Sequence, residues 1–318
     1  MYPSILKRSI LQKQLISSSF AGFLFFIALL GNTLSAQEQY ADSAQSAKSN
    51  NKKSVRNVAI ASAALYGACL YGLNQTWYQE FPRTGFHFFD DNTEWKQLDK
   101  VGHFYSSFHI SQASIHLFQH AGMSSGKANF WGGMMGFLIM APIEILDGFS
   151  AEYGASWGDL VANAVGSGTA MAQYMIWNEA RFKPKFSFAP TSLASERPNV
   201  LGDGFHEEFI KDYNGQTYWL SADIYSFLPK QTKFPKWLNL ALGYGVQNMI
   251  YASDYQNEIA GYDAYRQYYL AIDFDLSYLN SRSKALNTLL YLVDLIHLPA
   301  PAIEYNHADG VKFHFLKF

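Results

Sequence analysis

Three short polar segments interrupt an otherwise apolar stretch of the sequence, and they contain its best candidates for chemistry. Within each segment the side chains lie three or four residues apart, a spacing that places them on one face of a helix. Ionisable groups beside apolar sequence are costly unless they pair or line a wet cavity. We therefore expect the three segments to meet in the folded protein. The candidate residues are Asp99, Lys100, His103, Glu144, Asp147, Asp159 and Asn163.

These residue types could support acid–base or metal-assisted chemistry. His103 would carry a proton, the carboxylates would act as acids or metal ligands, and Lys100 would bind an anion. The same groups could instead form a structural network, in which Lys100 and His103 neutralise the carboxylates and hold the helices in register. The residues leave both interpretations open, and with them the question of whether the protein is an enzyme. They specify neither a cofactor nor a metal.

The order of the three segments also carries a resemblance to known families. The pattern is Asp99-Lys100-x-x-His103-Phe104, then Glu144-x-x-Asp147, then Asp159-x-x-x-Asn163-x-x-Gly166. Over about residues 57–180 it resembles the YfiM-like family of predicted periplasmic proteins, and its first and last parts more distantly resemble the VanZ-like membrane proteins. The resemblance implies a cell-envelope protein with a polar site. The association of VanZ-like proteins with glycopeptide-antibiotic tolerance implies an envelope lipid or glycan as substrate or signal.

The chain departs from both families. YfiM-like relatives are often lipoproteins, whereas no cysteine follows the N-terminal apolar run here, so we expect no lipoprotein processing. VanZ-like relatives carry an arginine in the loop before the last aspartate, where this chain has Glu152-Tyr153-Gly154-Ala155-Ser156. The single cysteine, Cys69, excludes an intramolecular disulfide and a multi-cysteine metal site.

Composition indicates an exported protein that contacts membrane lipid. Charged residues make up 16% and aromatic residues 17% of the chain, whereas soluble domains are about a quarter charged. The net charge of −2 gives no electrostatic basis for binding nucleic acid. We expect a signal peptide over residues 1–36 and a disordered spacer over 37–54. The expected location is the cell envelope, on a membrane facing the periplasm, with the outer membrane as an alternative; protein partners are not specified.

Residues 55–181 are expected to form an apolar helical domain. Small residues recur at intervals of four, as in Gly132 and Gly136, or Ala162, Gly166 and Ala170. Such spacing lets helix backbones approach closely, as apolar helices do in lipid, although a tightly packed soluble bundle is the alternative. The expected helices cover Asn57–Leu73, Lys100–His120, Ala128–Leu146 and Trp157–Trp177.

Residues 182–318 change to the period-two alternation of β-strands, which makes the fold class α+β. Pro184, Pro190 and Pro198 indicate a linker at the start of this domain, and Lys284–Leu298 is typical of one further helix. We expect an antiparallel sheet with one covered face, because the strands are too few for the smallest closed barrel. A non-catalytic structural protein and a small outer-membrane β-barrel-like protein remain alternatives. The expected strands are Tyr218–Ile224, Leu238–Gln247, Tyr268–Tyr278, Ala302–Tyr305 and Val311–Phe318.

Overall fold

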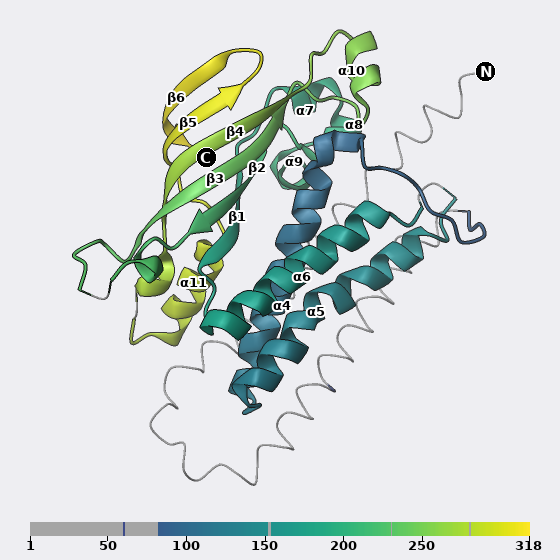
Figure 1. The fold of residues 1–318 in the computed structure, drawn as a ribbon. Coiled ribbons are helices and arrows are strands. Elements are labelled where there is room, and N and C mark those ends of the chain that lie inside the picture. The colour runs from purple at the N-terminus through teal and green to yellow at the C-terminus, as the bar shows by residue number, and fades with distance from the viewer. Residues whose placement is uncertain (1–59, 61–81, 152–153, 230, 280) are drawn as a thin grey trace.

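The computed structural model describes residues 60, 82–151, 154–229, 231–279 and 281–318. Figure 1 shows a bundle of three long helices beside a six-stranded sheet. The expected signal peptide, the spacer and the helix at Asn57–Leu73 lie outside the described residues, apart from Ile60.

Three helices of the bundle match the apolar runs of the sequence. They are α4 (Leu98–His120), which follows the short helix η2 (Glu94–Gln97), α5 (Ser125–Asp147) and α6 (Trp157–Trp177). The small-residue positions are contact points, as the sequence predicts. A Cβ added at Gly136 would collide with the Ser107 carbonyl, and one at Gly166 with the Phe104 carbonyl. Among the described helices, α5 alone is long and apolar enough to cross a membrane, a property shared by buried helices of soluble proteins.

The second half of the chain forms one antiparallel sheet with the strand order β1-β2-β3-β4-β5-β6. These strands and the helical bundle confirm the α+β prediction. The described strands form an open sheet and not a closed barrel. Short helices connect the strands: α7 (Leu193–Glu196), α8 (Pro198–Leu201) and α9 (Phe205–Lys211) precede β2, and α10 (Asp254–Ile259) precedes β4. The predicted further helix is α11 (Lys284–Asp294). The strands are β1 (Phe182–Phe188), β2 (Gln216–Ala222), β3 (Leu238–Gln247), β4 (Tyr265–Phe274), β5 (Ala300–Asn306) and β6 (Gly310–Lys317).

The linker expected at Pro184 is wrong, because this residue lies inside strand β1. A proline has no backbone N–H to donate, and sheets tolerate it on an edge strand. Strand β1 is at the end of the sheet order, with Pro184 opposite Leu220 of β2. The carbonyl of Pro184 accepts a hydrogen bond from Nε2 of buried His109 at 2.8 Å. Pro184 is therefore compatible with strand β1, because β1 is an edge strand and the Pro184 carbonyl is satisfied by a side chain of α4.

The helices and the sheet share one hydrophobic core. Tyr105 of α4 packs its ring edge-on against Tyr218 of β2, with the ring centroids 5.8 Å apart. The same cluster includes Leu98 at the start of α4 and Val246 at the end of β3, both fully buried. Helix α4 thus covers β1, β2 and one end of β3, and this packing holds its first turns in place (Figure 1). The first turns of α4 carry all three candidates of the first polar segment, Asp99, Lys100 and His103.

Candidate functional site

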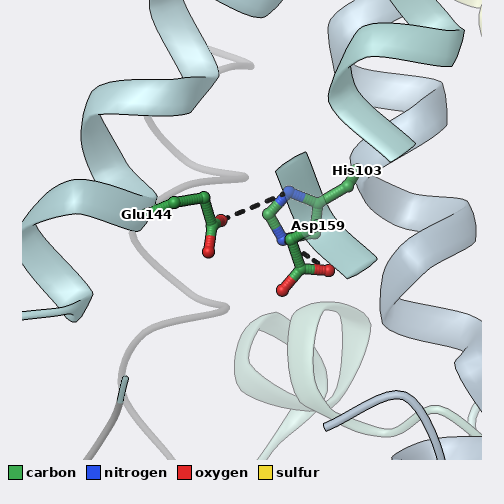
Figure 2. Close-up of side chains that lie close together, drawn as sticks. All are labelled: His103, Glu144 and Asp159. Carbon is green, nitrogen blue, oxygen red and sulfur yellow. Dashed lines mark ion pairs between the residues drawn. The ribbon is translucent and has the colours of Figure 1, made fainter. Parts of the chain in front are cut away.

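One residue from each long helix meets in a small polar cluster. His103 projects from α4, Glu144 from α5 and Asp159 from α6, and Figure 2 shows the imidazole ring between the two carboxylates. Nδ1 of His103 lies 3.7 Å from Oε1 of Glu144, and Nε2 lies 3.8 Å from Oδ1 of Asp159. The two ring nitrogens therefore face different acids, so the ring can bridge them.

Asn163 completes the surroundings of the ring. It lies one helical turn after Asp159 on α6, is fully buried, and places its amide oxygen 3.2 Å from Nδ1 of His103. An amide oxygen can only accept, so this contact requires a proton on Nδ1. With Nδ1 protonated, the facing carboxylate of Asp159 favours a second proton on Nε2. The geometry therefore favours the imidazolium form of His103.

Lys100 forms a second cluster directly beside the first. Its ammonium nitrogen lies 2.5 Å from Asp91, 2.9 Å from Asp99 and 3.0 Å from Asp159. Its side chain is largely buried, as are all three carboxylates. Asp159 belongs to both clusters and joins the lysine to the histidine. Lys100 thus pairs with three carboxylates of the protein itself, and its role in binding an anion stays a prediction.

The start of α6 sets the position of Asp159. Ser156 caps this helix, and its hydroxyl accepts a hydrogen bond from the backbone N–H of Asp159 at 3.1 Å. The same hydroxyl donates to Asp91 at 2.6 Å, while the Ser156 backbone N–H points to Oε2 of Glu144 at 3.4 Å. One serine thus connects the helix start to an acid of each cluster, as a serine at a helix N-cap can.

Burial and neighbouring charges shift the pKa values of these groups in different directions. Burial raises the pKa of Glu144 to about 8, His103 opposes this, and Asp159 and Asp147 add to it. Burial opposes the charge on His103, but Asp159 and Glu144 outweigh it and hold the pKa of His103 above its usual value. The cations His103 and Lys100 outweigh the burial of Asp159 and keep its pKa low. Near neutral pH, Glu144 therefore holds a proton while Asp159 is ionised.

Asp99 and Asp147 occupy less central places than the sequence analysis expected. Asp99 faces Lys100, and burial with the nearby Asp159 raises its pKa to about 6. Asp147 is the last residue of α5, one turn beyond Glu144, and acts on the cluster through its charge. The structure thus groups Glu144, Asp159 and Asn163 around His103, and Asp99 and Asp159 around Lys100. Catalytic roles for these residues stay predictions.

Asp91 and Ser156 were missed by the sequence analysis. Asp91 lies in the non-helical segment before η2, where no helical spacing connects it to the other acids. A signal for Ser156 was present, because a serine three residues before Asp159 at the start of an apolar helix is typical of an N-cap. Gly158 supports the same corner, since a Cβ there would collide with Asn92 and Lys100.

Two groups of side chains have the residue types and closeness of metal ligands. In the first, His103, Glu144 and Asp159 can each offer an atom within 4.8 Å of the others. In the second, the carboxylates of Asp91, Asp99 and Asp159 meet the same criterion, but the Lys100 ammonium lies among them. The first group is therefore the better place for a divalent metal, with imidazole and carboxylate ligands of the kind that zinc accepts.

Comparison with known families adds one finding. Residues 86–175 match the model of a family described as predicted periplasmic lipoprotein (DUF2279). The match covers less than a third of the chain and contains all three helices' contributions to the cluster. It ends before the sheet begins. Neither a curated protein nor a solved structure matches the chain.

Proposed function

We propose that the helical bundle carries an acid–base site of a cell-envelope protein, which acts on an envelope lipid or glycan. One observation carries this proposal: His103 lies between Glu144 and Asp159, with one ring nitrogen toward each. In its imidazolium form, a histidine so placed can give up one ring proton as a general acid and take a proton back as a general base. A buried glutamic acid with a pKa near neutrality is a suitable proton donor.

The exposure of the three side chains indicates where a substrate would enter. The side chain of His103 is 22% exposed, whereas those of Glu144 and Asp159 are 4% and 9% exposed. The histidine is therefore the group that a substrate reaches, with the acids behind it. This division suits a general acid–base catalyst, in which one group touches the substrate and buried partners set its protonation state.

The envelope setting rests on the family match and on the expected export signal. The matched family is described as periplasmic, and the match includes His103, Glu144, Asp159 and Asn163. A lipid or glycan is the substrate class that an envelope site would meet, and the apolar exposed residues of α6, such as Val161 and Val165, favour a site close to lipid.

The experiment uses the full chain, purified in detergent and incubated with extracted envelope lipids and with peptidoglycan. Products are identified by mass spectrometry for the wild type, His103→Asn and Glu144→Gln. His120→Asn is the matched control, since this exposed histidine ends the same helix. We expect the wild type and the control to convert one class of substrate, and the two site variants to lose conversion while circular dichroism shows an intact fold. Conversion that persists in His103→Asn would contradict the proposal. The proposal would also be contradicted if the wild type converted no substrate and the two site variants lost only their fold.

A second candidate function is divalent-metal binding by the same residues. The closeness of ligand atoms in His103, Glu144 and Asp159 favours it. Calorimetric titration with Zn²⁺ separates the two functions. Saturable binding that is lost in His103→Asn, together with an activity abolished by a chelator, supports the metal site. An activity that survives chelation supports acid–base catalysis by the side chains themselves.

A further inference from the structure

Strands β3 to β6 expose an apolar face to the surroundings. One row runs straight across the four strands, in which Leu242 pairs with Leu270, Leu270 with Ile303, and Ile303 with Phe313. Leu242 is 61% exposed and Phe313 69% exposed. Exposed apolar patches of this continuity are rare on soluble monomers and mark contact surfaces for protein or lipid. Further exposed members of the face are Leu240, Ile272, Tyr268, Tyr305 and Val311.

The opposite face of the same strands is buried, and it combines charged side chains with a small hydrophobic cluster that includes Trp219, Tyr269 and Ala271. Asp273 of β4 is fully buried, where it accepts a hydrogen bond from Ser221 at 2.6 Å and pairs with Lys185 at 2.9 Å. Its other oxygen lies 2.9 Å from Nδ1 of His297, which stacks on Trp219. A sheet in a soluble protein usually buries its apolar face and exposes its polar face. Here the ion pairs satisfy the buried charges, and beyond the end of β3 that α4 covers, the row from Leu242 to Phe313 stays exposed among the described residues.

Aromatic side chains border this face at both strand ends. Tyr244, Tyr268 and Tyr305 lie side by side on β3, β4 and β5 at one end. At the other end, exposed Trp237 stacks on Phe274 with the ring centroids 5.9 Å apart. Tyrosine and tryptophan have an apolar ring and a polar tip, and they are enriched where protein meets the headgroup level of a membrane.

The loops at the Trp237 end present positive charge. The backbone of Asp275 donates to the carbonyl of Trp237, so loops 223–237 and 275–283 lie together. Their two acids are buried: Asp223 accepts from Tyr278, and Asp275 pairs with Lys183. The exposed charged side chains in the described part of these loops are basic, namely Lys233, Lys236 and Arg282. This charge complements an anionic headgroup layer.

We propose that the apolar face of β3–β6 binds the surface of a bilayer that contains anionic phospholipid. Strand β6 ends the sheet, and its outer edge pairs with no other strand among the described residues. Unpaired backbone groups are excluded from the hydrocarbon core, so the face enters the boundary between headgroups and acyl chains rather than crossing the bilayer. The basic loops then contact the headgroups, and the row from Leu242 to Phe313 contacts the acyl chains. This surface is independent of the proposed acid–base site.

A single-label experiment tests the contact on the full chain. In a Cys69→Ser background, Leu242→Cys carries an environment-sensitive fluorophore. Ile259→Cys is the matched control, because Ile259 is 70% exposed but lies on α10, outside strands β3–β6. Each labelled protein is added to vesicles of phosphatidylcholine with phosphatidylglycerol, with or without nitroxide groups on the acyl chains. We expect a blue shift and quenching at position 242 and neither at position 259.

Two outcomes would overturn the proposal. Equal quenching at both positions would show that the protein adsorbs to the vesicles without using this face. A blue shift at position 242 that grows with protein concentration in the absence of lipid would assign the face to a second copy of the chain.

Charge reversal in the basic loops provides a second test that leaves the apolar face unchanged. One lysine near an anionic surface contributes a free energy equivalent to roughly fivefold in binding. Lys236→Glu should therefore weaken binding to vesicles with phosphatidylglycerol at least roughly fivefold, and leave binding to pure phosphatidylcholine unchanged. Lys127→Glu, a change of the same charge at an exposed position of α5, is the control. An equal effect of both substitutions would remove the role assigned to the basic loops.

Discussion

Nδ1 of His103 lies 3.7 Å from Oε1 of Glu144, and the two side chains reach each other across the interface of α4 and α5. The contact sets a buried acid with a raised pKa beside a base whose pKa is also raised. Because the pKa of Glu144 is about 8, protonation of this pair changes near neutral pH and above, and folding stability and site chemistry respond to the same protons.

Stability should fall as the pH rises toward the pKa of Glu144. Between its ordinary value of 4.5 and about 8, the folded protein holds a proton on Glu144 that the unfolded chain has lost. The free energy of unfolding should therefore decrease over this window, by up to about 1.4 kcal/mol per pH unit. The raised pKa of His103 acts in the same direction, since its stabilising proton is also lost as the pH rises. Chemical denaturation across a pH series should show a shallower decline for Glu144→Gln, and an identical slope would refute the assignment.

Removing the charge of Asp159 should lower the pKa of His103. Asp159 is the strongest of the charges that raise this pKa, and Asp159→Asn keeps the shape of the side chain. Titration of the His103 ring by NMR measures the effect. Glu179→Gln, an exposed acid just beyond the other end of α6, should leave the His103 titration in place. A shift of similar size in both variants would mean that general charge and not the local contact controls His103.

Lys100→Met should be strongly destabilising. The substitution keeps much of the side-chain volume but leaves Asp91, Asp99 and Asp159 without the cation they share. Loss of one partner from a buried ion network costs about 3–5 kcal/mol. Thermal unfolding should show this loss, whereas Lys127→Met at an exposed position should change stability by less than about 0.5 kcal/mol.

The same variant makes a second test possible. The three carboxylates lie close enough together to hold a metal ion. Added Mg²⁺ or Ca²⁺ should therefore raise the melting temperature of Lys100→Met more than that of the wild type. Equal responses would show that the acids separate once the lysine is gone.

Glycine at position 136 should be required for the bundle to close. A Cβ there would collide with the Ser107 carbonyl and with the hydroxyls of Ser111 and Ser167. Gly136→Ala should cost about 1–3 kcal/mol, the usual range for overpacking. Gly168→Ala on α6 is the matched control, since a Cβ there meets no atom within 4 Å and should stabilise the helix by about 0.5–1 kcal/mol. Denaturation of both variants measures the difference, and similar effects would contradict close packing at Gly136.

The sequence alone determined the local elements of this fold. The apolar run from Trp157 to Trp177 and the alternation from Leu238 to Gln247 predicted a helix and a strand with the observed ends. It also placed His103, Glu144 and Asp159 on helices, because spacing of three or four residues is a local property of the chain. The expectation that their segments meet followed from the cost of leaving such groups unpaired in apolar surroundings.

Only the tertiary structure decided which distant charges pair and which sheet face is buried. Asp91 reaches Lys100 from a segment without helical spacing, so no local pattern could connect them. The alternation of β4 defines two faces but does not say which is covered. The buried face is the one that carries Asp273, because Lys185 from β1 and His297 from the segment before β5 pair with this side chain and satisfy its charge. Hydrophobic periodicity acts along a few residues, whereas a buried ion network forms only where separate segments are packed together.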